Sequence, residues 1–191
     1  MVINPVMEAI KSRRSIRSFE DKPVPDSVIQ TLLEAATYAP SAINVQPWKF
    51  TLITNKAEMK RLSDKAKPVL IRALPDVGDE GLVGLKRRLS DPQYNIFYNA
   101  PLLIFVSGVK SPYAVYDCSM AAQNMMLVGF TMGIGSCWIG TAVHTANDPK
   151  VKADLGVPED HEVHAAIIFG YPKGVTKAPV KRSAQVLKRI D

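Results

Sequence analysis

The sequence predicts a three-layer α-β-α sandwich, and three observations support this fold class. Four short apolar segments have the length and composition of strands: 48–54, 102–107, 136–140 and 163–169. Segments with helical spacing separate them. No linker or repeat divides the 191 residues, and their 47% hydrophobic content is enough for one core, so a single domain is expected. Periodicity alone does not decide whether the sheet is parallel, as in a doubly wound fold, or mixed.

Apolar residues spaced i, i+3 and i+4 indicate where the helices lie. Five helices are predicted: 5–11, 26–39, 56–66, 112–132 and 149–155. Asn4 can cap the first helix, and Pro5 suits its first position because its missing N–H has no helical partner there. Asp26 or Ser27 is expected to cap the second helix, which Pro40 ends.

Two stretches lack a clear pattern. Residues 67–99 contain helical parts, but no boundary can be assigned within them. From residue 173 the chain is basic and only loosely amphipathic. Residues 173–191 are therefore expected to form a C-terminal arm without a core of its own.

Composition argues against a secreted or membrane protein. Residues 1–10 lack the basic and apolar regions of a signal peptide, so a cytoplasmic location is expected. The longest apolar stretch, 113–132, carries Asp117, Gln123 and Asn124, which suit a buried helix and not a membrane span. These three side chains need partners once buried, as structural or interface hydrogen bonds.

The two cysteines and the net charge indicate the redox state of the thiols and the kind of ligand that suits the chain. Cys118 and Cys137 have no C-x-x-C spacing and predict reduced, buried thiols. The net charge is +6, and the residues that carry it cluster in 11–22, 56–88 and 173–189. Such clusters suit an anionic ligand. Nucleic acid is not favoured, because these clusters hold few aromatic residues.

A basic cluster follows the first helix directly. Arg13, Arg14, Ser15 and Arg17 supply three guanidinium groups and a hydroxyl within five residues, a good set of donors for a phosphate. An extended backbone would place Arg14 on one side and the other three on the opposite side. Taken alone, the cluster is better explained as a solvated basic turn.

The turn after the second helix is more unusual. The chain stops at Pro40 and presents Ser41, Asn44 and Gln46 before Trp48. Such a turn offers rigid amide and hydroxyl groups to a ligand. Taken alone, these side chains are better explained as partners of the turn's own backbone.

Three glycines, Gly133, Gly135 and Gly140, surround the third strand. Backbone N–H groups in such a segment can approach a flat ligand without side-chain obstruction. The motif is not a dinucleotide fingerprint, because its third glycine comes too late and it follows a helix. Cys137 has no base placed to activate it, which favours a packed thiol.

The sequence does not favour a metal site. His161 and His164 are three residues apart and could be ligands. They fall at a predicted strand, however, and a third ligand is not apparent.

The order of these segments resembles the nitroreductase family of FMN enzymes. The family patterns Arg-Arg-Ser-x-Arg-x-Phe, Ala-Pro-Ser-x-x-Asn-x-Gln-Pro-Trp and Gly-x-Gly-Ser-Cys-Trp-Ile-Gly match residues 13–19, 39–48 and 133–140. Smaller features also fall in place: Ala100-Pro101, Asp117, Asn124, Gly170-Tyr171-Pro172 and Lys181-Arg182. The resemblance covers nearly the whole chain except residues 67–99.

The resemblance implies an FMN cofactor in a cleft between the two subunits of a homodimer. The implied cofactor-binding residues are Arg13, Arg14, Ser15, Arg17, Pro40, Ser41, Ala42, Asn44, Cys137, Trp138, Ile139, Gly140, Lys181 and Arg182. Arg13, Ser15 and the pair 181–182 would hold the phosphate, with Arg14 close by on the ribityl chain. Arg17 would reach the pyrimidine end of the ring. Residues 40–44 would come from the other subunit, and the backbone of 138–140 would approach the N5 edge of the flavin.

The resemblance also implies an α+β fold whose four-stranded sheet is mixed and mainly antiparallel. The arm, residues 173–191, would embrace the dimer partner and add a strand to its sheet. This implication favours the mixed sheet that periodicity left open.

The implied activity is reduction of a nitroaromatic or quinone at the expense of NADH or NADPH, in two hydride transfers that use one slot. No dedicated acid or base is required, and a guanidinium such as Arg17 would favour the negative charge of reduced flavin. The family covers the flavin and selects the substrate with its counterpart of residues 67–99, where this chain departs from the pattern. Tyr94, Phe97 and Tyr98 either line that pocket or belong to the core.

Other functions remain open from the sequence. Dehalogenases and flavin destructases share the scaffold of this family. A flavin-binding protein without turnover and a basic RNA-binding domain are the alternatives outside this group of enzymes.

Overall fold

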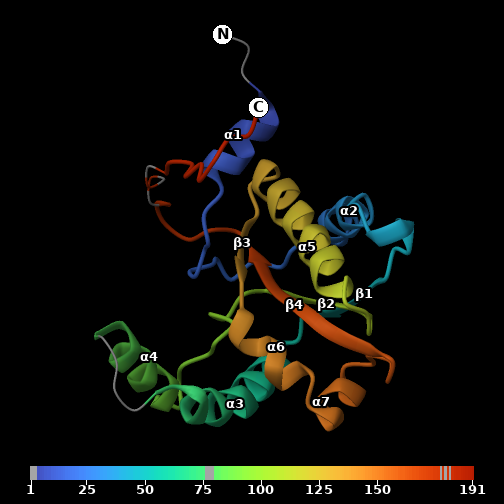
Figure 1. Cartoon of the computed structure of the whole chain (residues 1–191). Helices are drawn as coiled ribbons and strands as arrows, with labels where there is room; N and C mark the ends of the chain where they lie inside the picture. Colours follow the sequence, from blue (N-terminus) through green and yellow to red (C-terminus); the bar gives the residue numbers. More distant parts are fainter. Residues whose placement is uncertain (1–3, 76–79, 177, 179, 181) are drawn as a thin grey trace.

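The structure, a computed structural model, describes residues 4–75, 80–176, 178, 180 and 182–191. At its centre is an antiparallel sheet in the order β1-β2-β4-β3 (Figure 1). Its strands are β1 (Trp48–Ile53), β2 (Leu102–Val109), β3 (Gly135–Trp138) and β4 (His161–Gly170). The α+β class and the four strands are confirmed, and a parallel doubly wound sheet is excluded. Across the described ranges, an isolated bridge between Ser15 and Ser136 is the one parallel contact.

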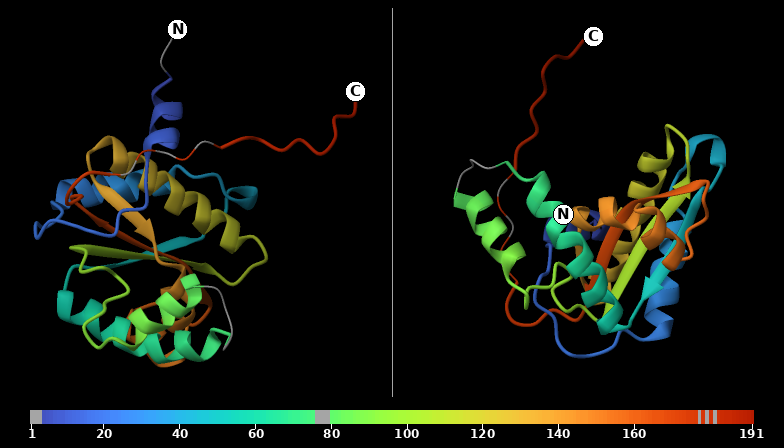
Figure 2. Two further views of the ribbon diagram at one scale, coloured as in Figure 1. Left: turned by 90° about the vertical axis from the view of Figure 1, so that its left-hand side faces the viewer. Right: turned by 90° about the horizontal axis from the view of Figure 1, so that it is seen from below.

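Helices cover both faces of the sheet (Figures 1 and 2). One face is covered by α2 (Asp26–Thr37) and α5 (Ala114–Thr131), and the other by α3 (Lys56–Ala73), α6 (Gly140–Ala146) and α7 (Pro149–Asp154). The remaining helices lie outside these layers: α1 (Pro5–Ser12) contacts α5, and α4 (Glu80–Ser90) contacts α3. The predicted α-β-α sandwich is therefore confirmed.

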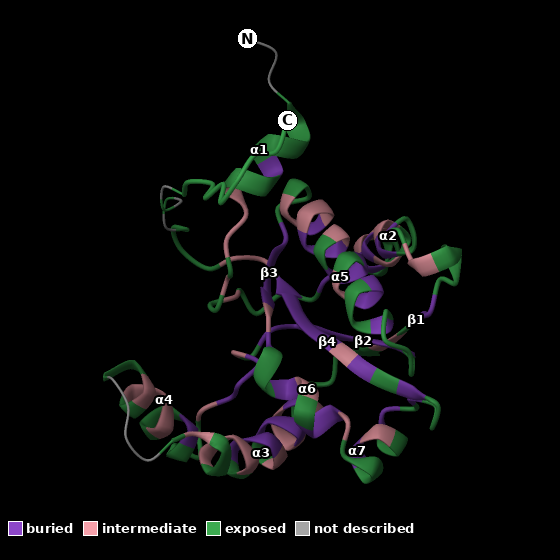
Figure 3. Ribbon diagram, in the orientation of Figure 1, coloured by how far each residue is buried: buried purple, intermediate pink, exposed green. Residues whose placement is uncertain are grey.

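The core has two halves because strand side chains alternate between the faces of the sheet. From β2, Leu102, Ile104 and Val106 pack beneath α2 and α5, whereas Leu103 and Phe105 pack beneath α3 and α6. All five are buried, and Figure 3 shows the central strands in the buried colour. This burial on both faces explains why the apolar run did not reveal the direction of the strands.

The predicted N-cap of α2 is wrong. Pro25, and neither Asp26 nor Ser27, occupies the N-cap position, without a side-chain cap. The carbonyl of Pro25 instead accepts hydrogen bonds from Val28 and Ile29. The backbone therefore begins this helix without help from a polar side chain.

Two other boundaries also differ from the predictions. α3 continues past residue 66, through Pro68, because Leu70 and Ile71 still pack against the core. A proline removes one helical N–H, and the buried face of the helix outweighs that loss. The strand predicted for 136–140 ends at Trp138, because Gly140 begins α6. This helix escaped prediction because it is short and rich in β-branched residues.

The described part of the arm leaves the body after β4 and extends away from it (Figure 2). Its large apolar side chains, among them Val186, Leu187 and Ile190, are at least 77% exposed. Within the described residues, none of the helices combines the length and the apolar character needed to cross a bilayer.

Candidate functional site

The segment 13–18 is held against β3. Its backbone N–H at Ile16 donates to the carbonyl of Ser136 at 2.9 Å, next to the bridge between Ser15 and Ser136. Gly135 permits this approach, because a Cβ there would lie 2.7 Å from Cγ1 of Ile16. The space left by Gly135, which was predicted to admit a flat ligand, is filled by a neighbouring segment of the chain.

The other end of the segment is paired with the chain that follows β4. Glu20 donates to Tyr171 at 2.9 Å, and Lys173 donates to Ser18 at 3.0 Å. A bridge between Phe19 and Pro172 completes this pairing. The basic segment is therefore a fixed wall and not a free turn.

A cleft of about 570 Å³ opens between this wall and the start of the arm. Its polar lining includes Arg13, Arg14, Ser15, Arg17, Lys173 and Arg182. The structure thus brings together the basic segment and one member of the predicted pair in the arm. Lys181, the other member, lies outside the described residues.

The cleft concentrates positive charge. The pKa of Arg13 lies below its usual value, mainly because of burial and also because Arg14 and Arg182 repel its charge, while Cys137 acts in the opposite direction. Among the residues that the structure describes, no carboxylate forms an ion pair with Arg13, Arg14, Arg17 or Arg182. Such a cluster favours an anion in the cleft.

Arg14 uses its guanidinium differently from Arg13. One terminal nitrogen donates to the carbonyl of Lys11 at 2.5 Å and the other to the carbonyl of Arg13. The side chain thus closes the C-terminal end of α1, where carbonyls lack helical partners. Its Nε is buried without a partner. Arg14 therefore borders the cleft but directs both of its terminal nitrogens to the helix end.

Cys137 lies behind the basic wall and is 1% exposed. Burial raises the pKa of its thiol, while Arg17, the hydroxyl of Ser15 and Arg13 act in the opposite direction. The interpretation as a packed, reduced thiol agrees with this burial.

A second, smaller cleft of about 160 Å³ meets the end of β3. Arg17, Trp138, Ile139 and Gly140 line it together with Tyr94 and Tyr98. The N–H of Ile139 already donates to the carbonyl of Ala166 at 2.7 Å. Gly140 is the first residue of α6, where an N–H has no acceptor within the helix. Of the predicted 138–140 backbone, the N–H of Gly140 is therefore better placed for a ligand than that of Ile139.

The sequence left open whether Tyr94, Phe97 and Tyr98 line a pocket or the core. The structure separates them: Phe97 is 1% exposed within the core, whereas both tyrosines line the small cleft. Their hydroxyl oxygens are 3.2 Å apart, and their rings meet edge to face with centroids 6.0 Å apart. The guanidinium of Arg17 lies 6.0 Å from the ring centroid of Tyr98.

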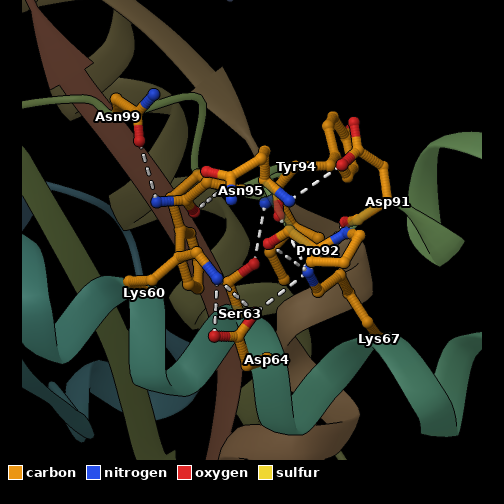
Figure 4. Close-up of polar contacts among 12 residues, drawn as sticks. Lys60, Ser63, Asp64, Lys67, Asp91, Pro92, Tyr94, Asn95 and Asn99 are labelled. Carbon is orange, nitrogen blue, oxygen red and sulfur yellow. Dashed lines mark hydrogen bonds and ion pairs between the residues drawn. The ribbon is translucent and has the colours of Figure 1, made fainter.

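A buried lysine holds the loop that carries these tyrosines (Figure 4). Nζ of Lys67 donates to the carbonyls of Asp91, Pro92 and Tyr94 at 3.0 to 3.3 Å and lies 2.9 Å from Oδ1 of Asp64. One turn earlier on α3, Oγ of Ser63 accepts the N–H of Ile96 at 3.0 Å. Sequence reasoning missed this contact, because nothing marks Lys67 as different from the other lysines of a basic helix.

The turn with Pro40, Ser41, Ala42 and Asn44 does not join this group. None of these residues lines either cleft. Figure 1 shows the turn, in cyan beyond α2, on the other side of α5 from the basic segment. Within one chain, the two parts of the predicted cofactor site are therefore separate.

Several contacts hold this turn in shape. Ala42 donates its N–H to Oδ1 of Asp117 on α5 at 3.2 Å, and Gln46 donates its N–H to Oγ of Ser41 at 3.0 Å. Ile43 and Asn44 have positive φ angles of 43° and 58°. A branched side chain such as Ile43 disfavours this conformation, so the surrounding contacts must impose it.

The histidines considered as ligands do not gather other ligands. His161 pairs through Nδ1 with Asp160 at 2.8 Å. Burial lowers the pKa of His164, and its Nε2 is buried without a partner. In the described part of the chain, no three His, Cys, Asp or Glu side chains are arranged to hold a metal ion.

Comparison with known proteins gives a consistent result. The model of the Nitroreductase family matches residues 10–171. A protein of Archaeoglobus fulgidus named "Putative NADH dehydrogenase/NAD(P)H nitroreductase" is 30% identical over 167 residues, which cover 87% of this chain and 85% of that protein.

Solved structures are similar over nearly the whole chain. A nitroreductase with bound FMN from Bacteroides fragilis has a TM-score of 0.82 and 34% identity, and the match covers 99% of this chain and 100% of that one. A BluB-like flavoprotein from Clostridium difficile has a TM-score of 0.76 over 98% of this chain and 100% of its own, at 20% identity, and shows the likeness of the fold alone.

Proposed function

The chain belongs to the nitroreductase family, and from this we propose that it is an FMN-dependent oxidoreductase that transfers electrons from NAD(P)H to a small planar acceptor. FMN is its cofactor and supplies the hydride chemistry when bound. Nitroaromatics and quinones are the proposed acceptors, reduced in the second of two steps that share one slot. Two buried thiols without a disulfide agree with a cytoplasmic location.

The observation that carries this proposal is the uncompensated positive charge of the larger cleft. Burial lowers the pKa of Arg13 most, and repulsion by Arg14 and Arg182 lowers it further, so these charges lie close to one another. A phosphate would relieve this repulsion and accept hydrogen bonds from guanidinium groups and from Ser15. The residues present therefore fit the phosphate end of FMN, with Lys181 as a further proposed ligand.

The smaller cleft suits the ring end of the same cofactor. Arg17 lines both clefts and so connects them. We assign it to the pyrimidine end, where its charge would favour the anionic reduced flavin. The N–H of Gly140, together with the neighbouring backbone of Cys137, Trp138 and Ile139, would face the other edge of the ring.

The separation of residues 40–44 from both clefts supports a site made by two subunits. We propose that the turn serves the partner's flavin in a homodimer, with Asp117 holding Ala42 in place. Tyr113 at the N-cap of α5, and Tyr116 and Met120 within it, are exposed in the single chain and are proposed to lie in the interface. Residues 173–191 would form an arm of the single domain 1–191 that embraces the partner and adds a strand to its sheet.

The cofactor content of the purified protein tests the proposal directly. We expect a yellow protein with a flavin spectrum, close to one FMN per chain, that oxidises NADH or NADPH under anaerobic conditions when a quinone is present. A colourless folded protein would contradict the proposal. A yellow protein without turnover would instead indicate flavin binding without catalysis.

A screen of acceptors separates nitro or quinone reduction from the other reactions of this scaffold. The expected result is faster anaerobic oxidation of NAD(P)H with a nitroaromatic or a quinone than with a halogenated aromatic. Turnover with the halogenated compound alone would assign the dehalogenase reaction.

A further inference from the structure

We infer that Tyr98 recognises an electron-rich oxygen of the acceptor, as the donor at the cleft end of a hydrogen-bonded pair with Tyr94 that lies near the charge of Arg88. This inference rests on the proposed function and names the class of acceptor: a planar aromatic or quinone that carries a nitro, carbonyl or carboxylate oxygen. Neither tyrosine belongs to the motifs that indicated the cofactor site.

The position of the pair supports this role. Tyr94 and Tyr98 are partly buried and share the small cleft with Arg17, Trp138 and Gly140. A flat ligand that enters this cleft therefore meets two phenol rings as well as the end of β3. Phenols combine an apolar face with a hydrogen-bond donor, which suits a flat ligand with a polar edge.

The hydrogen bond between the two phenols runs from Tyr94 to Tyr98. The hydroxyl of Tyr94 donates to the oxygen of Tyr98, 3.2 Å away. Arg88 lies close enough to Tyr94 for its positive charge to act on that hydroxyl. In the described part of the chain, the hydroxyl proton of Tyr98 has no acceptor. It is therefore available to a ligand.

The chain of donors should gain strength when negative charge develops on the ligand. Tyr94 polarises the hydroxyl of Tyr98, and the nearby positive charge of Arg88 adds to this effect. Burial and the bond to Tyr98 raise the pKa of Tyr94 to about 12, so this phenol stays protonated in the physiological range. An acceptor oxygen becomes more negative as electrons arrive, and a preorganised donor stabilises that change.

The backbone around Tyr98 is fixed and strained. Tyr98 and Asn99 both have φ near 53°, a left-handed conformation that non-glycine residues seldom adopt. Lys67 and Ser63 hold the preceding turn against α3, and the side chain of Asn95 accepts the N–H of Phe97. Strain of this kind persists when the surroundings impose it, and it often accompanies a functional site.

The test uses benzoate as a probe and benzyl alcohol as a neutral ligand of similar size. Calorimetry measures their dissociation constants with the FMN-loaded protein and with Tyr98→Phe, Tyr94→Phe and Arg88→Gln. Arg87→Gln is the matched control, because Arg87 is also an exposed arginine of α4, adjacent in the sequence, and it does not act on Tyr94. Both tyrosine variants keep the ring and remove only the hydroxyl.

We expect Tyr98→Phe to weaken benzoate binding by roughly tenfold, in line with the loss of one hydrogen bond to a charged group. Benzyl alcohol binding should change by less than about threefold. Tyr94→Phe and Arg88→Gln should weaken benzoate by about threefold each, and Arg87→Gln should leave it unchanged. Because Arg88 acts through Tyr98, its effect should disappear in the double variant Arg88→Gln/Tyr98→Phe.

Three results would overturn the inference. Benzoate binding could be unchanged in Tyr98→Phe, or Arg88→Gln and Arg87→Gln could weaken it equally. The third is an Arg88→Gln change that weakens benzoate binding as much in the Tyr98→Phe protein as in the native one. If Tyr98→Phe does not fold, unchanged binding in Tyr94→Phe would overturn it as well. Absence of the flavin spectrum would count against the proposed function instead. Calorimetry of the flavin-free protein would still report whether the hydroxyl contributes to benzoate binding.

Discussion

Arg13 and Arg14 are neighbours in the sequence, but their guanidinium groups have different tasks. Arg14 turns back to the carbonyls at the end of α1, whereas Arg13 lies in the cationic cleft beside Arg182. The motif marks both residues equally. Only the path of the chain after α1 separates a helix cap from a proposed phosphate ligand.

Arg13→Glu should produce a folded but colourless protein. The new carboxylate would repel a phosphate and also remove a donor from the cleft. The measurement is the ratio of FMN to protein after purification, with circular dichroism to check folding. Arg72→Glu makes the same change of charge at an exposed position in the last turn of α3 and should stay yellow. Stoichiometric FMN in Arg13→Glu would place the phosphate elsewhere.

Cys118 links stability to pH through its burial beneath α5. It is fully buried, and burial, followed by the nearby charge of Asp117, raises the pKa of its thiol to about 12 from an ordinary value of 9.0. The folded state thus keeps a proton that the unfolded state releases. This contribution to stability is complete below pH 9 and is lost as the pH rises toward 12.

The variant Cys118→Ala should be about 1 kcal/mol less stable at pH 7, because a small void replaces the sulfur. Between pH 9 and pH 10 the difference from the native protein should shrink by about 1 kcal/mol. Chemical denaturation at each pH measures both values. Parallel stability curves for the two proteins would contradict the assignment.

At the scale of elements, α3 is the clearest difference between expectation and structure. Its predicted end at residue 66 rested on the loss of a clear pattern, and the helix in fact continues to Ala73. That extension carries Lys67, whose Nζ reaches the 91–94 turn, and it brings the two tyrosines to the cleft. The least legible part of the sequence therefore forms one wall of the candidate site.

Lys67→Met should loosen residues 91–99 and lower stability by about 1–3 kcal/mol, because three carbonyls lose their donor. Hydrogen exchange should become faster at the amides of Ile96 and Phe97, whose bonds belong to this loop. Lys65→Met removes a lysine with only a distant ion pair on the same helix and should leave this exchange unchanged. Equal exchange in both variants would show that Lys67 does not hold the loop.

At the scale of the whole molecule, a single chain presents two incomplete parts of the proposed site. The basic segment lies on one side of α5 and the turn of residues 40–44 on the other, and this turn lines neither cleft. The arm extends from the body with its apolar side chains exposed. These features agree with the proposed homodimer, in which each subunit completes the site of the other.

Deleting residues 177–191 should weaken the dimer and flavin binding together, because the arm is proposed to contribute both apolar contacts and cations. The dissociation constant of the dimer, from analytical ultracentrifugation, should rise by at least about tenfold, with a parallel loss of FMN. The conservative control is Arg189→Gln, which removes one exposed charge and leaves the arm in place. A truncated protein that stays dimeric and yellow would exclude this role of the arm.

The sequence by itself determined the fold class, the strands and the family. Apolar runs such as 102–107 and motifs such as 13–17 are local patterns, and local patterns reflect burial and backbone conformation directly. It also indicated the charged segment and the buried thiols. It did not determine the direction of the strands, because an apolar run that is buried on both faces looks the same in either direction.

The tertiary structure decided which residues meet. It brought Arg13 to Arg182, Arg17 to Tyr98 and Lys67 to the turn that carries Tyr94, and it kept residues 40–44 apart from them. These contacts join segments far apart in the chain, and their identity depends on the packing of whole helices and strands. For that reason the basic segment was recognisable in the sequence, whereas the choice between pocket and core for Tyr94, Phe97 and Tyr98 needed the tertiary structure.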